Sequence, residues 1–260
     1  MKFSGWFFIS QKPTTLEKTN TTHMKIVLLV FLLLISFNNI QAQEITGQEL
    51  LAKTIEFHDP NGHWSAFVSN LKMTETRPNG TDRSSVISIN NLTGDFKVEG
   101  KSDSLMITRG VKNDSCYVLV NGSASFDEAL VKQYRLKCER STMFKNYYVY
   151  LYGLPMKLTD DGTIIDEKVE TVDFTGAQYY KLRVTYEKEV GSDIWYFYIN
   201  PETYAMEAYQ FYHDESTGKG EYITLDGMVE IQGIKFPKAR KWFTNLEDKH
   251  LGTDTIVSGN

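Results

Sequence analysis

The stretch "WYFYINPETYAMEAYQFYHDE", residues 195–215, places two aromatic-rich segments on either side of a turn. A strand with one solvated face alternates apolar and polar residues. Here Trp195, Phe197 and Ile199 would share one face of a strand, while tyrosines occupy the other face. The sequence "NPET" has Asn before Pro, which is favoured at the first two positions of a type I turn. The stretch therefore predicts an antiparallel hairpin with aromatic rings on both faces.

Short runs rich in β-branched and aromatic residues continue this pattern on both sides of the hairpin. The first run, "WSAFVSNLKMTE", begins at residue 64, and turn sequences such as "RPNGTD" separate the runs. This spacing is typical of an antiparallel meander. After the hairpin, the glycines of "ESTGKGE" can adopt a positive φ. We therefore expect three adjacent antiparallel strands at residues 195–199, 204–213 and 220–226.

Two regions of helical pattern interrupt the strands. Thr46 can cap a helix whose apolar stripe covers residues 50–55, and the turn sequence "DPNG" follows that helix. Residues 125–158 contain good helix formers, with apolar pairs spaced four apart. We expect two consecutive helices there, ended by Gly153 and Pro155. The predicted fold class is α+β with a majority of β structure.

The N-terminus resembles an export signal. The apolar run at 26–37 follows a lysine and precedes small residues, so residues 24–42 are expected to form a signal peptide. Residues 1–23 are polar and are interpreted as a non-native extension before the true start at Met24. The apolar run is shorter than the roughly 20 residues that cross a bilayer, and no cysteine follows that could carry a lipid. We therefore predict a single periplasmic domain at 43–260 without a transmembrane anchor.

Composition and cysteine content narrow the function further. With 41% hydrophobic and 23% charged residues, the 260-residue chain is typical of a globular protein. Its net charge of -5 and scattered basic residues exclude the basic stripe of a nucleic-acid-binding protein. An exported chain reaches an oxidising compartment, where Cys116 and Cys138 can form a disulfide that stabilises by roughly 3 kcal/mol. Two buried free thiols are the alternative.

Two groups of histidine and acidic residues raise the question of metal binding or catalysis: "HDPNGH" at 58–63 and "HDE" at 213–215. Neither group has the i, i+4 histidines or the tight Cys and His pairs of zinc sites. The chain also lacks the G-x-S-x-G signature of a serine hydrolase. We therefore predict no metal site, no catalytic residue and no cofactor.

Several segments resemble known families: "NYYVYLYGLPMKL", "GTIID", "GEYITLDG", "IQGIKFPKARKW" and the opening stretch. From about Thr46 to Thr255, the chain resembles a family of exported Bacteroidota proteins of unassigned function. More distantly, the strands that lead into "NPET" and "GEYI", followed by "GIKFP", resemble the LolA-like superfamily of outer-membrane lipoprotein carriers. That resemblance implies an open half barrel, a curved antiparallel meander whose concave face is covered by helices and can hold acyl chains.

The aromatic residues and this resemblance together predict a soluble, monomeric periplasmic binding or carrier protein. Its partner would be a lipid or other hydrophobic small molecule, held between the concave sheet and the helices of 126–153. Strand alternation is expected to place Tyr209 and Phe211 on one face and Met206 on the other. The candidate ligand-binding residues are Trp195, Phe197, Met206, Tyr209 and Phe211 of the sheet, and Tyr147, Tyr148, Tyr150 and Tyr152 of the helical region.

Two other classes of protein remain open at this stage. One is an envelope hydrolase, in which His213, Asp214 and Glu215 would be the first residues to test. The other is a non-enzymatic interaction module of an envelope assembly, which would copurify with protein partners and without lipid.

Overall fold

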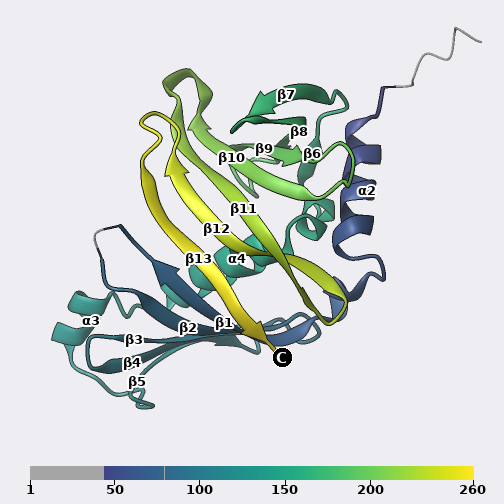
Figure 1. Ribbon diagram of the computed structural model, residues 1–260. Helices are drawn as coiled ribbons and strands as arrows, with labels where there is room; N and C mark the ends of the chain where they lie inside the picture. The colour runs from purple at the N-terminus through teal and green to yellow at the C-terminus, as the bar shows by residue number, and fades with distance from the viewer. Residues whose placement is uncertain (1–43, 79) are drawn as a thin grey trace, which may run out of the picture. The chain divides into compact units, whose positions relative to one another are not determined.

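The computed structural model describes residues 44–78 and 80–260, and these contain thirteen strands that pair antiparallel in one sheet (Figure 1). The predicted N-terminal extension and signal peptide, 1–23 and 24–42, lie outside the described residues. Residues 45–260 form one compact unit. The strands are β1 (Val68–Thr76), β2 (Arg83–Asn90), β3 (Asp95–Ser102), β4 (Leu105–Lys112), β5 (Ser115–Val120), β6 (Thr163–Ile165), β7 (Glu170–Phe174), β8 (Ala177–Tyr186), β9 (Ile194–Ile199), β10 (Met206–Asp214), β11 (Lys219–Ile231), β12 (Ile234–Thr244) and β13 (His250–Gly259).

The sheet consists of two meanders joined by their first and last strands. Its order is β5-β4-β3-β2-β1-β13-β12-β11-β10-β9-β8-β6, with β7 also paired to β8. The only neighbours on this path that are far apart in sequence are β1 and β13, where Met73 lies opposite Ile256. The predicted meander is confirmed, including the adjacency of β9, β10 and β11. The sheet remains unclosed, because β5 and β6 are at opposite ends of this order.

The helices lie where the sequence predicts them. Thr46 and Glu49 form a capping box at the start of the first helix. The second helical region connects β5 to β6, which are the two ends of the sheet, so it must cross a face of the sheet. Figure 1 shows its long helix behind β11, β12 and β13, on what we call the inner face. The helices are α2 (Gly47–His58), α3 (Glu128–Tyr134) and α4 (Glu139–Gly153), with short 3-10 segments at His63–Ala66, Met156–Thr159 and Glu215–Thr217.

One predicted strand start is wrong. Residues 63–66 form a 3-10 helix instead of extending β1. The Asp59 carboxylate accepts hydrogen bonds from the backbone N–H groups of His63 and Trp64, both at 2.8 Å. These bonds hold the chain in a turn until Phe67, so β1 begins at Val68.

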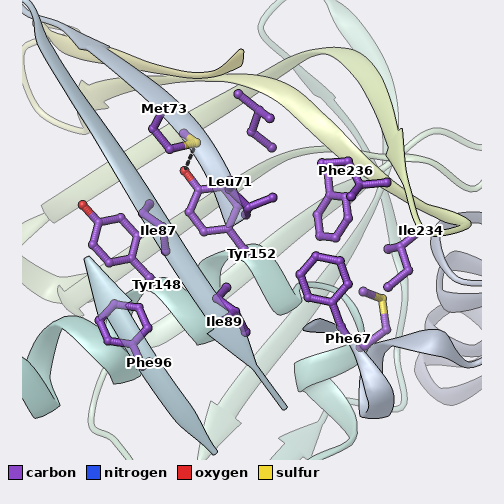
Figure 2. Close-up of a cluster of buried hydrophobic side chains, with 13 residues drawn as sticks. Phe67, Leu71, Met73, Ile87, Ile89, Phe96, Tyr148, Tyr152, Ile234 and Phe236 are labelled. Carbon is purple, nitrogen blue, oxygen red and sulfur yellow. Dashed lines mark hydrogen bonds between the residues drawn. The ribbon is translucent and has the colours of Figure 1, made fainter. Parts of the chain in front are cut away.

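The hydrophobic core lies between the inner face and the helices. Figure 2 shows Tyr148 and Tyr152 of α4 among buried side chains of β1, β2, β3 and β12. The Tyr152 hydroxyl lies 3.5 Å from the sulfur of Met73. A second cluster joins Leu50 of α2 and Leu151 of α4 to the inner face of β8–β11. Burial of each such side chain stabilises the fold by about 2 kcal/mol, so α4 is fixed against both halves of the sheet.

The β9–β10 hairpin has the predicted turn but not the predicted alternation. Asn200 accepts hydrogen bonds from the N–H groups of Glu202 and Thr203, as expected for its place before Pro. A register shift between Met206 and Ala208 then places Met206 opposite Ile199 and Tyr209 opposite Phe197. The expectation that Met206 faces away from Tyr209 is therefore wrong, because a β-bulge adds one residue and both face the inner side.

The predicted disulfide is confirmed. Cys116 of β5 is bonded to Cys138, the residue before α4, with their Cα atoms 5.5 Å apart. This separation lies within the normal range for a disulfide. The bond joins the start of α4 to one end of the sheet.

Candidate functional site

A cleft of about 870 Å³ lies between α4 and the inner face of the sheet, and we call it the α4 cleft. Residues of β1, β2 and β9–β13, or of the turns beside them, form its other side. Its volume is within the usual range for sites that bind small molecules. The aromatic residues that line it are Phe144, Tyr147, Tyr148, Tyr150, Trp195, Phe211 and Trp242.

Rings of α4 pack against rings of the sheet along this cleft. Tyr147 stacks on Trp242 with ring centres 6.3 Å apart, and Tyr150 meets Trp195 edge to face at 5.3 Å. Trp195 in turn stacks on Phe211, its partner across the β9–β10 pair, at 4.9 Å. The walls of the cleft are thus built from aromatic pairs, which offer apolar area with defined geometry.

The predicted site residues divide into two layers. Five of them line the α4 cleft, and Tyr147 is the most accessible, with 44% of its surface exposed. The other four are at most 1% exposed and do not line it. Five of the nine predicted residues thus border a cleft, whereas the other four, three of them aromatic, belong to the core. The lining residues are Tyr147, Tyr148, Tyr150, Trp195 and Phe211, and the core residues are Tyr152, Phe197, Met206 and Tyr209.

The sheet side of the cleft contains a charged group that sequence reasoning missed. Arg240 is 1% exposed, lies 4.3 Å from the centre of the Tyr152 ring, and donates to the carbonyls of Pro237 and Leu151. Asp254 faces Arg240 across the β12–β13 pair and accepts a 3.0 Å hydrogen bond from the Trp242 indole N–H. Burial, together with the nearby charge of Glu75, raises the pKa of Asp254 to about 6.

A buried hydroxyl adds to this polar group. Tyr209 is fully buried, and its hydroxyl has no hydrogen-bond partner among the described residues. Burial raises the pKa of Tyr209 to about 12, although the Arg240 charge acts in the opposite direction. The polar atoms near the aromatic walls are therefore only partly satisfied by the protein. The sequence did contain a signal that could have located Arg240 and Trp242. They are two residues apart in "KARKWF", a spacing that places both on the same face of a strand.

The charged lining residues of the cleft differ between its two sides. Arg77 and Arg83 lie at β1 and β2, Arg140 lies in the first turn of α4, and Glu75 of β1 lines the cleft beside them. Asp193, His213 and Glu221 lie at β9–β11, and Asp254 lines the cleft from β13. His213 pairs with Asp193, with Nδ1 2.9 Å from Oδ1. Burial raises the pKa of Glu221. The cleft thus has aromatic walls, three arginines and one glutamate at one side, and two acidic residues with one histidine at the other side.

The "HDE" sequence does not form one site. Asp214 accepts from the N–H and hydroxyl of Ser216 and so caps the following 3-10 turn. Glu215 accepts a hydrogen bond from the Tyr196 hydroxyl. Only His213 lines the cleft, and among the described residues Asp193 is its one hydrogen-bond partner. Within the same part of the chain, no group of three or more His, Cys, Asp or Glu could hold a metal ion.

A mostly antiparallel, unclosed sheet with a helix across its inner face defines a LolA-like fold, and comparisons with known proteins agree. The chain is similar to a LolA superfamily protein from Nitrosomonas europaea, with TM-score 0.51 and 14% identity over 83% of this chain and 93% of that chain. It is also similar to a domain assigned to outer membrane lipoprotein sorting from Vibrio parahaemolyticus, with TM-score 0.50 and 10% identity over 82% and 91% of the two chains.

The chain belongs to the family described as "Family of unknown function (DUF6503)", which it matches over residues 24–259. No curated protein sequence matches it. Within the described residues, no helix is both long and apolar enough to cross a membrane.

Proposed function

We propose that this protein is a periplasmic binding or carrier protein that holds a lipid or other apolar small molecule in the α4 cleft. The observation that carries the proposal is an aromatic-walled cleft of about 870 Å³ inside a LolA-like half barrel. The proposal includes export by the signal peptide at 24–42 and action as a monomer. Hydrolysis by the "HDE" group is less well supported, because among the described residues His213 pairs with Asp193, while Asp214 and Glu215 bond to Ser216 and Tyr196.

The physical basis is the apolar surface that a ligand would cover. Tyr147 is 44% exposed, and the rings of Trp195, Phe211 and Trp242 are half-buried beside it. Each Å² of apolar surface removed from water contributes about 25 cal/mol. Covering a few of these rings offsets part of the entropy cost of association. A small, strongly hydrated ligand without an apolar part would gain little from such walls.

The test combines native mass spectrometry with a binding assay. Protein purified from the envelope of its host should carry lipid-sized adducts, and the purified chain should bind the neutral fluorescent probe N-phenyl-1-naphthylamine. Tyr147→Asp introduces a charge into the wall of the cleft and should weaken probe binding about tenfold, since an unpaired charge resists burial. Asn146→Asp adds the same charge outside the cleft on α4 and should leave binding unchanged. Absence of adducts together with equal binding by both variants would contradict the proposal.

A further inference from the structure

Three arginines from separate parts of the chain line the α4 cleft. Arg77 follows β1, Arg83 begins β2, and Arg140 is in the first turn of α4. All three line the cleft, and Arg77 and Arg83 also line a neighbouring hollow that contains Lys101 and Lys249 together with Asp82 and Asp103. We call Arg77, Arg83 and Arg140 the arginine rim.

The charge of the arginine rim is poorly neutralised by the protein. Among the described residues, Arg83 and Arg140 have no carboxylate within 4.0 Å, while Arg77 lies 3.8 Å from Glu75. The Nε atom of Arg140 is buried and has no hydrogen-bond partner in this part of the chain. Burial and the charge of Arg140 both lower the pKa of the nearby Arg109. A buried donor of a permanently charged side chain lacks an acceptor here, and an anion would supply one.

The surroundings of the arginine rim select an amphiphile rather than a simple anion. Met143, Phe144 and Tyr147 follow Arg140 along α4 and line the same cleft, so an anion at the rim lies beside apolar wall. Asp193 and Glu221 at the opposite side repel an anion, and so do Glu75 beside Arg77 and Asp254 of β13, which leaves Arg83 and Arg140 as the attracting end of the cleft. The strands of the two sides are separated by three spacings, from β1 to β11, up to six, from β2 to β9, or roughly 15 to 30 Å along the curved sheet. This polarity fixes one orientation, with a negative group at the rim and an apolar chain along the aromatic walls.

We propose that the arginine rim binds the anionic headgroup, phosphate or carboxylate, of an amphiphile whose apolar chain occupies the α4 cleft. The inference rests on the proposed function and adds to it the chemical class of the ligand. Guanidinium groups match phosphate and carboxylate oxygens with two parallel hydrogen bonds, which lysines at the same positions would not provide. Arg83 and Arg140 are the residues whose charge is free to make these bonds.

The experiment compares two amphiphiles that share a chain and differ in the headgroup. Decyl phosphate and decyl maltoside, both below their critical micelle concentrations, compete with the neutral fluorescent probe for the wild-type full chain. Inorganic phosphate alone is the third competitor. The test variant is Arg83→Gln with Arg140→Gln, and the control is Lys72→Gln with Lys112→Gln. The control removes two charges from exposed positions that line none of the hollows described above.

We expect the wild type and the lysine control to bind decyl phosphate about tenfold more tightly than decyl maltoside, because charge-assisted hydrogen bonds add to the same apolar contact. The arginine variant should lose this preference while keeping its affinity for the maltoside, and circular dichroism should show that it is folded. An arginine variant that keeps the preference overturns the inference. The inference is also overturned if inorganic phosphate competes with the probe as strongly as decyl phosphate does, because that result would indicate a site for a free anion. If neither amphiphile binds the wild type, both the proposed function and the headgroup inference fail. If both bind the wild type with equal affinity, only the headgroup inference fails.

Discussion

The buried ring of His58 connects α2 to two strands of the sheet. Its Nε2 accepts a 3.0 Å hydrogen bond from the N–H of Met206, so Nδ1 carries the proton and donates to the carbonyl of Lys235 at 2.7 Å. His58 is fully buried, and this burial lowers its pKa to about 4. The neutral ring satisfies two backbone groups, which is a structural role and leaves no lone pair for a metal.

His58→Gln should remove a pH dependence of stability. In the wild type the unfolded state takes up a proton at His58 below pH 6.5, while the folded state does so only near 4. The contribution of His58 should therefore lower the free energy of unfolding by about 3 kcal/mol as the pH drops from 6.5 to about 4. The variant should lose this dependence and be about 2 kcal/mol less stable at pH 7. Urea denaturation at several pH values measures both, with the exposed His63→Gln as the control. Equal pH profiles for wild type and His58→Gln would contradict the assignment.

Asp254 should give stability a pH dependence opposite in sign to that of His58. Its pKa is raised to about 6, so between pH 4 and pH 6 the folded state holds a proton that the unfolded state has released. Ionisation of Asp254 therefore costs the folded state stability as pH rises. Asp254→Asn keeps an acceptor for Trp242 and cannot ionise, so its stability relative to wild type should increase by about 2 kcal/mol from pH 4.5 to pH 7.5. Denaturation curves at the two pH values measure the change, and the exposed Asp161→Asn should show none.

Among the secondary-structure elements, α4 depends on the disulfide for the position of its first turn. Cys138 precedes α4 and lies two residues before Arg140 of the arginine rim. It is bonded to Cys116 of β5. Replacing both cysteines by serine should lower stability by roughly 3 kcal/mol through the freed loop. It should also weaken binding of decyl phosphate more than binding of decyl maltoside, because Arg140 is no longer held at the rim. Equal weakening for both amphiphiles would show that the bond supports the cleft as a whole.

Among the helices, strands and turns, the sequence predicted those that depend on local neighbours and missed those that depend on contacts across the fold. The capped helix at Thr46 and the Asn200 turn depend on neighbours in sequence, so local patterns predicted them. The bulge at Met206 changes the face of a whole strand segment, and it coincides with a contact that is distant in sequence, the hydrogen bond from the Met206 N–H to His58 of α2. Likewise, alternation grouped Phe197 with Trp195 and Tyr209 with Phe211, but it could not show that Phe197 and Tyr209 lie in the core while Trp195 and Phe211 line the cleft. Contacts made across the fold leave no local signal.

For the whole molecule, the topology explains why a site forms at α4. The pairing of β1 with β13 joins two meanders into one curved sheet, and the chain between β5 and β6 must pass from one end of this sheet to the other. Helix α4 makes this crossing on the inner face, where it contacts both halves of the core. Because the helix fills only part of the concavity, the remaining space is the α4 cleft. The resemblance to carriers predicted this arrangement, whereas the pairing of two distant strands had no signal in the residues themselves.

Ligand binding at this site should stabilise the entire unit, since α4 and both meanders contribute to the cleft. At a free decyl phosphate concentration 100 times the dissociation constant, the folded state gains about 2.7 kcal/mol. For a chain of this size that gain should raise the melting temperature by about 5 to 10 °C. At the same concentration, the variant with Arg83→Gln and Arg140→Gln, which binds about tenfold more weakly, should gain about 1.4 kcal/mol and half the shift. Differential scanning calorimetry measures both shifts. A wild-type melting temperature that does not respond would show that the amphiphile does not bind the folded protein. An equal response from Tyr147→Asp would place binding outside the α4 cleft.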